Sequence, residues 1–192
     1  ISEKYNYVKP EISSHIQSFV KANGLRHCLI EHLQTDETYV TNDIVLGKDS
    51  QNGILLYGVN ASGKTSFIRS LGIATILAQC GMYVPCKRFQ YKPYHAIYSR
   101  ILGNDNLFKG MSTFAVEISE LRVILKMANE NSMILGDELC SGTETESALS
   151  IFVASMMHIC KQNSSFIFAT HFHEILDYEE IKSLKTLKMY HM

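Results

Sequence analysis

The stretch Gly58-Val59-Asn60-Ala61-Ser62-Gly63-Lys64-Thr65 decides the fold class of this chain. It fits the phosphate-binding pattern G-x-x-x-x-G-K-[ST] at every fixed position. Residues 54–57 before it form a short apolar run typical of a buried strand, and apolar residues recur at helical spacing after it. The stretch therefore predicts a strand, a glycine-rich loop and a helix in succession. A chance glycine loop before a helix is disfavoured because all three parts are in register.

This arrangement suits the binding of a nucleoside triphosphate with Mg²⁺. Glycines let the backbone curl until its N–H groups point at phosphate oxygens, and the helix adds the positive end of its dipole. Lys64 is expected to reach the β- and γ-phosphates, and the Thr65 hydroxyl is expected to complete a Mg²⁺ shell. The predicted ATP-binding residues of this stretch are Gly58, Asn60, Ala61, Ser62, Gly63, Lys64, Thr65 and Ser66.

The composition indicates a globular intracellular protein segment. A chain of 192 residues with 46% hydrophobic and 19% charged residues suits one domain with a substantial core. The net charge of −1 argues against a strongly basic surface that would be the main binding site for nucleic acid. Local basic patches are still compatible with this charge. Five cysteines without a C-x-x-C pair predict neither a zinc knuckle nor a disulfide framework, which favours a reducing compartment. No apolar run approaches transmembrane length.

Two domain-level regions are expected. Apolar residues after Pro10, among them Phe19 and Val20, fit one helix face, so residues 1–23 are predicted to form a connecting helix or linker from a preceding domain. Residues 24–192 are predicted to form the nucleotide-binding domain. The opening without methionine and the uncapped end indicate a fragment of a longer protein.

The rest of the chain alternates short apolar strands with long amphipathic helices. This alternation predicts an α/β fold with a mostly parallel sheet, helices on both faces and a small N-terminal β extension. The Lys182–Lys188 run is expected to be structural or solvated. The expected elements are short strands at 28–30, 39–40 and 44–46, a strand at 94–99, a helix from Thr113, a strand at 133–135, a helix over 148–159 and a strand at 166–169.

Asp137 and Glu138 follow one predicted strand, and His171 follows the next. Ligands of parallel sheets gather at the carboxyl ends of strands, which puts all three beside the phosphate loop. Asp137 suits Mg²⁺ coordination through water, and Glu138 suits polarisation of the attacking water. His171 could donate a hydrogen bond to a γ-phosphate; a structural or solvated histidine is an equally good interpretation. Tyr39 could stack on an adenine, although plain packing explains it too.

The motifs together resemble the ATPase domain of the MutS family of DNA mismatch-recognition proteins, over residues 26–173. The phosphate loop has Asn60 where the family has an Asn, and Gly81–Pro85 resembles the family pattern G-x-[FY]-V-P. Gly110–Phe114, together with Glu117, resembles G-x-S-T-F-x-x-E. Asp137–Thr143 resembles D-E-[IL]-x-x-G-T, and Ala169–His171 resembles A-T-H. Departures from the family pattern are Lys109 for Ser, Cys28 for Pro, Cys140-Ser141 for Gly-Arg, and Asn106 for Asp.

The resemblance implies a P-loop ATPase of the ABC-like type that works as a dimer. Two domains would pair head to tail, with a homologous copy or a related MutS-like subunit, and Ser112 would contact the partner's nucleotide. ATP binding and hydrolysis would drive a clamp that other domains close around mismatched DNA, with downstream repair factors as further partners. The resemblance implies that this chain lacks the C-terminal element that strengthens dimerisation in the family.

Other classes of protein share parts of this pattern. An ABC-type transporter or a chromosome-maintenance ATPase head would carry an L-S-G-G-type signature just before the acidic strand, where residues 128–131 read Ala-Asn-Glu-Asn. A scaffold that binds ATP without turnover is disfavoured by Thr65 and Glu138. A kinase or GTPase is disfavoured because no N-K-x-D motif appears.

Overall fold

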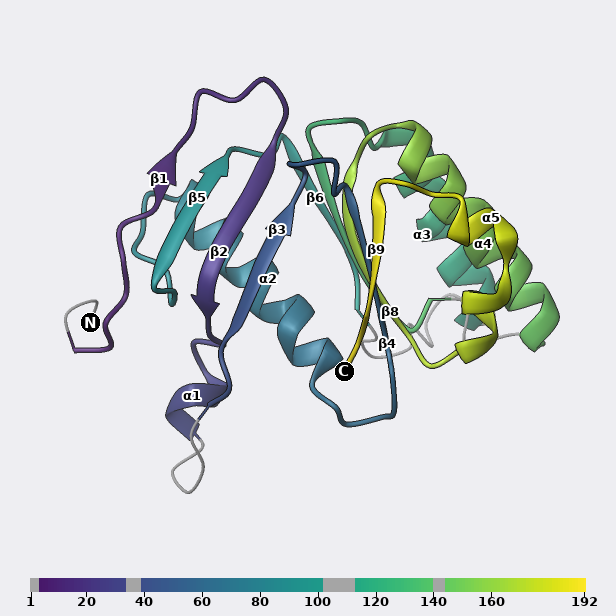
Figure 1. Cartoon of the computed structure of the whole chain (residues 1–192), viewed down its shortest axis with the longest axis horizontal. Helices are drawn as coiled ribbons and strands as arrows, with labels where there is room; N and C mark the ends of the chain where they lie inside the picture. The colour runs from purple at the N-terminus through teal and green to yellow at the C-terminus, as the bar shows by residue number, and fades with distance from the viewer. Residues whose placement is uncertain (1–3, 34–38, 102–112, 140–143) are drawn as a thin grey trace.

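The computed structural model describes residues 4–33, 39–101, 113–139 and 144–192. Its two sheets lie one on each side of a long helix (Figure 1). The larger sheet has the order β6-β7-β8-β4-β9, and each pair of neighbours runs parallel. Its strands are β4 (Gly53–Tyr57), β6 (Ala96–Arg100), β7 (Ser132–Asp137), β8 (Ser165–Thr170) and β9 (Leu187–His191).

The central strands of this sheet are buried along their whole length. Every residue of β7 and β8 is buried, which explains their nearly continuous apolar sequences. Strands covered on one face only would instead alternate apolar and polar residues. The expected strands at 133–135 and 166–169 are therefore confirmed, and helices must cover both faces of the sheet.

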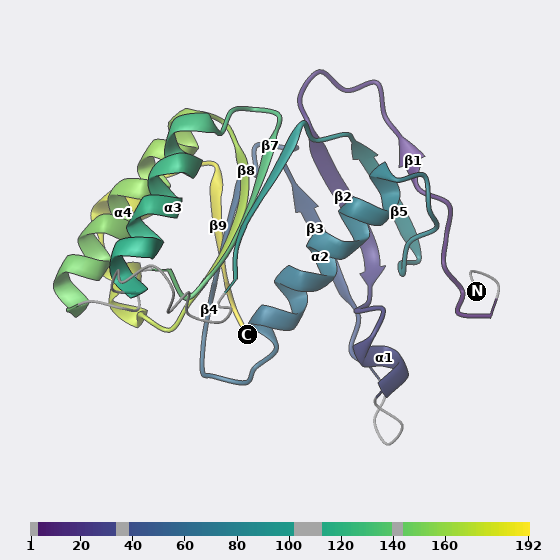
Figure 2. The same cartoon turned by 180° about the vertical axis from the view of Figure 1, so that it is seen from behind.

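Helices do cover both faces. The long helix α2 (Lys64–Gln79) packs on one face, and its buried positions include Phe67 and Leu71, two of the apolar residues that recur at helical spacing after the loop. The opposite face carries a second hydrophobic cluster, and Figure 2 shows the helices on that face from behind. The elements on that face are α3 (Thr113–Met127), α4 (Thr145–Lys161), the 3-10 helix η2 (His173–Asp177) and α5 (Glu179–Lys182).

The smaller sheet has the order β1-β5-β2-β3 and covers the outer side of α2. The Tyr91 hydroxyl, for example, donates a hydrogen bond of 2.8 Å to the Ala78 carbonyl of α2. The smaller sheet is the N-terminal β extension that the sequence predicts, enlarged by one later strand. Its strands are β1 (Glu11–Ile12), β2 (Phe19–Leu25), β3 (Asn42–Leu46) and β5 (Arg88–Lys92).

Several predicted elements near the N-terminus are wrong. The helix expected after Pro10 is absent from the described residues, because β2 pairs with β3 and β5. The strand expected at 28–30 is a turn leading into α1 (Ile30–Leu33), and residues 39–40 form a loop. β2 runs through the boundary expected between residues 23 and 24, so that division of the chain stays a prediction.

No helix within the described ranges is both long and apolar enough to cross a membrane. The fold class expected from the sequence is confirmed: a mostly parallel sheet with helices on both faces, in the P-loop arrangement.

Candidate nucleotide-binding site

The predicted phosphate loop connects β4 to α2 at the carboxyl edge of the larger sheet. Three of its residues have positive φ: Gly58 (144°), Ala61 (62°) and Gly63 (99°). Glycine adopts such angles without a steric penalty, whereas alanine in this region costs about 1–2 kcal/mol. The loop backbone is therefore curled. At Ala61 this conformation is unfavourable by itself, so contacts with neighbouring residues must stabilise it.

Lys64, the first residue of α2, turns back into this loop. Its side chain is buried, and its ammonium group donates hydrogen bonds to the carbonyl oxygens of Gly58 (2.9 Å) and Val59 (2.7 Å). A third contact, at 3.4 Å, joins the ammonium to the Ser62 hydroxyl. A buried ammonium group is stable only when polar partners replace its water shell. The ammonium group of Lys64, which is predicted to contact phosphate, thus lies inside the loop.

Thr65 connects the loop to the acidic end of β7. Its hydroxyl donates a hydrogen bond of 2.5 Å to Oδ2 of Asp137, whose side chain is buried. A hydroxyl and a carboxylate are hard oxygen donors of the kind that Mg²⁺ takes in proteins. These two residues, predicted as the metal site, are brought together by the fold and fit that ion.

Glu138 and His171 meet at the ends of neighbouring strands. Glu138 directly follows β7, and its N–H donates to the Ala169 carbonyl of β8 at 3.0 Å. Oε1 of Glu138 lies 3.9 Å from Nδ1 of His171, the residue after β8. Glu138 adopts φ of 51°, a conformation that costs about 1–3 kcal/mol in a non-glycine residue and is common at functional sites.

A cavity of about 180 Å³ joins the loop to Glu138. The remaining wall of the cavity comes from the loop and the first turn of α2, at Asn60, Ala61, Ser62, Gly63, Lys64, Thr65 and Ser66. The predicted phosphate-binding residues other than Gly58 therefore share one cavity with the predicted general base.

Of the predicted site residues that the structure describes, Gly58, Tyr39, Asp137 and His171 do not line this cavity. Tyr39 is half-buried in the loop before β3 and does not line the cavity. Ser112 lies outside the described residues. The roles expected for Tyr39 on the adenine and for Ser112 on a partner's nucleotide stay predictions.

The strand β9 and the residue after it are not predicted from the sequence. The N–H of Met192 donates to the Tyr57 carbonyl at 3.0 Å, immediately before the phosphate loop. Met192 also lines a second cavity of about 360 Å³ between the edges of the two sheets, with Phe67 and Leu56. Residues 187–192 (Leu-Lys-Met-Tyr-His-Met) show no regular alternation of apolar and polar side chains, so no periodic signal marks this strand in the sequence.

Comparison with known proteins agrees with this geometry. Residues 54–192 match the family profile described as MutS domain V. The chain is 40% identical, over its whole length, to a DNA mismatch repair protein mutS homolog of Acanthamoeba polyphaga mimivirus, covering 20% of that protein. It is 40% identical to a mitochondrial DNA mismatch repair protein mutS homolog of Sarcophyton glaucum, over 90% of this chain and 18% of that protein.

A bacterial relative is also similar over nearly the whole chain. The DNA mismatch repair protein MutS of Staphylococcus haemolyticus is 38% identical over 97% of this chain and 21% of its own length. The chain thus spans about a fifth of the length of these relatives. With its domain V match and its whole-length similarity, this chain belongs to the MutS family of DNA mismatch repair proteins.

Proposed function

We propose that this chain is the ATP-binding and ATP-hydrolysing domain of a mismatch repair protein. The observation that carries the proposal is the shared cavity, in which Glu138 faces the same space as the phosphate loop residues. Binding without hydrolysis would need no carboxylate at that position. The match to MutS domain V favours this function over a transporter or chromosome-maintenance ATPase.

Each residue has a distinct role in the proposed reaction. The loop N–H groups and Lys64 bind and orient the phosphates, so that the γ-phosphate faces Glu138. Thr65 and Asp137 would hold Mg²⁺, which would supply positive charge to the phosphates. Glu138 accepts a proton from the attacking water, and His171 orients Glu138 and the γ-phosphate.

The active form is proposed to be a dimer with shared sites. Ser112 of one subunit would contact the nucleotide that the other subunit's phosphate loop binds. The partner would be a second copy or a related MutS-like subunit. Mismatched DNA would be held by other domains of the longer protein, and ATP turnover would switch that clamp between search, sliding and signalling to downstream repair factors. The cysteine pattern favours a reducing compartment.

The solution mass of the Glu138→Gln variant, measured by light scattering with and without ATP and Mg²⁺, tests this proposal. Glutamine keeps the shape of the side chain but accepts a proton poorly, so ATP should accumulate and hold the dimer. A monomer that becomes a dimer only with ATP is expected. A monomer at every ATP concentration, with labelled ATP bound, would contradict the shared site.

Ser112→Ala separates the two subunits' contributions. It should lower the turnover of ATP more than its binding, because Ser112 is proposed to act on the partner's nucleotide. A phosphate-release assay beside a binding titration measures both quantities. A loss confined to binding would place Ser112 in its own subunit's site.

A further inference from the structure

We infer that Met192, at the end of β9, is a positioning residue that holds the phosphate loop in its curled conformation. Three observations carry this inference: the register of β9 beside β4, the approach of the Met192 backbone to Gly58, and the approach of its side chain to Gly63. Its relevance to ATP rests on the proposed function, because the loop is taken to bind phosphate.

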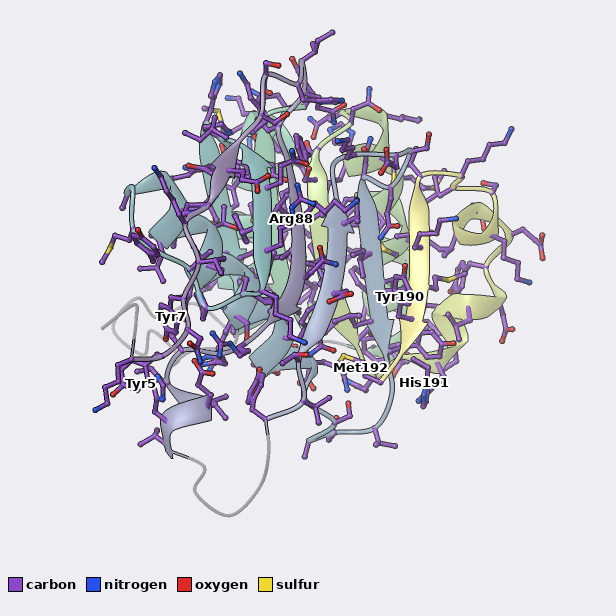
Figure 3. All side chains as sticks on the ribbon, turned by 60° about the vertical axis from the view of Figure 1, so that its left-hand side comes forward. Tyr5, Tyr7, Arg88, Tyr190, His191 and Met192 are labelled. Carbon is purple, nitrogen blue, oxygen red and sulfur yellow. The ribbon has the colours of Figure 1, made fainter. Side chains whose placement is uncertain are left out.

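The register of β9 places Met192 beside the start of the loop. β9 pairs with β4 along its whole length, from Gly53 opposite Leu187 to Tyr57 opposite His191. The rings of Tyr57 and His191 lie 5.3 Å apart, and the hydrogen bond from the Met192 N–H to the Tyr57 carbonyl extends the ladder by one residue. Figure 3 shows His191 and Met192 at the end of this strand.

The backbone of Met192 packs directly on Gly58. A Cβ atom built on Gly58 would lie 2.1 Å from the Met192 carbonyl oxygen, far inside van der Waals contact. Glycine is therefore required here by the approach of β9 as well as by its φ of 144°. The Gly58 carbonyl accepts the hydrogen bond from Lys64, so the residue is held from two directions.

The side chain of Met192 reaches the second fixed glycine of the loop. Its terminal methyl carbon lies 3.9 Å from the position that a Cβ would take on Gly63, so it is the nearest neighbour on that side of the glycine. The rest of the side chain packs on the core between the sheets and lines the cavity that Phe67 also lines. The unbranched thioether is well suited to fill such an irregular space. Met192 thus lies beside both glycines of the loop, with its backbone against Gly58 and its methyl group near Gly63.

These contacts matter because the loop acts through the direction of its N–H groups. A phosphate is bound tightly only if those groups already point at its oxygens, since ordering them on binding costs free energy. Removing the Met192 side chain leaves the sheet hydrogen bonds intact but frees the space beside Gly63. The loop should then sample other conformations, and its amides should exchange with solvent faster.

Hydrogen–deuterium exchange of the segment 58–65, measured without nucleotide in the longer protein, tests this inference. Met192→Ala should speed exchange of the loop amides by about threefold or more, because local opening becomes easier. Met192→Leu, which keeps the volume, should restore exchange to within about twofold of the wild type. Met189→Ala is the matched control, because Met189 lies on the same strand and is 39% exposed; it should leave the loop unchanged.

Two results would overturn the inference. Loop exchange in Met192→Ala equal to that in Met189→Ala would remove the positioning role. Faster exchange spread evenly over β4 and β8 would show that Met192 serves general packing instead. ATP affinity gives a separate readout: Met192→Ala should weaken binding about fivefold, with Met192→Leu restoring it. Failure of the wild type to bind ATP would count against the proposed function, while the exchange data would still decide the role of Met192.

Discussion

Thr65 and Asp137 are joined by a hydrogen bond of 2.5 Å between the Thr65 hydroxyl and Oδ2 of Asp137. The two residues are 72 positions apart. Thr65 lies in α2, which follows β4, and Asp137 ends β7, and β8 lies between those two strands. The bond therefore ties the first turn of α2 to the acidic end of β7 across the sheet. It brings together the two oxygen donors that the proposed Mg²⁺ site needs.

A double-mutant cycle should measure this coupling. Thr65→Val removes the donor and Asp137→Ala removes the acceptor of a charge-assisted hydrogen bond at a buried carboxylate, so a coupling free energy of about 1.5 kcal/mol or more is expected. Denaturant unfolding of the wild type, both single variants and the double variant gives the value. Strictly additive effects would show that the bond contributes nothing to stability.

Loss of the Lys64 ammonium should abolish nucleotide binding. Lys64→Ala removes the charge that the loop surrounds, and titration calorimetry with ATP is expected to give no measurable heat of binding. Lys188→Ala is a suitable control, because Lys188 lies on the exposed part of β9. Unchanged ATP affinity in Lys64→Ala would contradict the assignment of the phosphate loop.

Replacement of Glu138 should separate binding from hydrolysis. Glu138→Gln is expected to keep ATP affinity within about threefold while slowing phosphate release about a hundredfold or more, since it loses the general base. Glu174→Gln, a change at an exposed residue of η2, should leave both quantities unchanged. Wild-type turnover in Glu138→Gln would assign proton transfer to another group.

The stability of the domain should fall in alkaline solution through Cys86. Burial raises the pKa of the Cys86 thiol from 9.0 to about 12, which means that the folded state favours the neutral thiol. This contribution is fully present below pH 9 and is lost as the pH rises from 9 toward 12. Unfolding free energies measured from about pH 8 to 11 should therefore drop less in Cys86→Ala than in the wild type.

The exposed Cys80 supplies the control for that measurement. Cys80→Ala should show the full alkaline loss of stability seen in the wild type. A thiol reagent at pH 8 should modify Cys80 quickly and Cys86 only on unfolding, since the thiolate is the reactive form. An identical pH profile in Cys86→Ala and the wild type would rule out the buried thiol as the cause.

Sequence patterns failed where strand pairing overrode local periodicity. Phe19 and Val20 fit a helical face, yet β2 is a strand because β3 and β5, from later in the chain, provide hydrogen-bond partners on both of its edges. The expectation that the Lys182–Lys188 run is structural or solvated fits its exposed lysines. It did not include the strand β9, which begins at Leu187 and whose backbone pairs with β4. Neither outcome is visible in a short window of sequence.

The sequence by itself determined the phosphate loop, the order of buried strands and long helices after it, and the positions of Asp137 and Glu138 at a strand end. Local rules are enough for these features, because glycine conformations, helical periodicity and continuous apolar runs act over a few residues. Tertiary structure alone decided that Thr65 bonds to Asp137, that Glu138 faces the loop cavity and that Met192 packs on Gly58. Those contacts join segments distant in sequence, and only the pairing of β4 with β8 and β9, and of β8 with β7, brings them within reach.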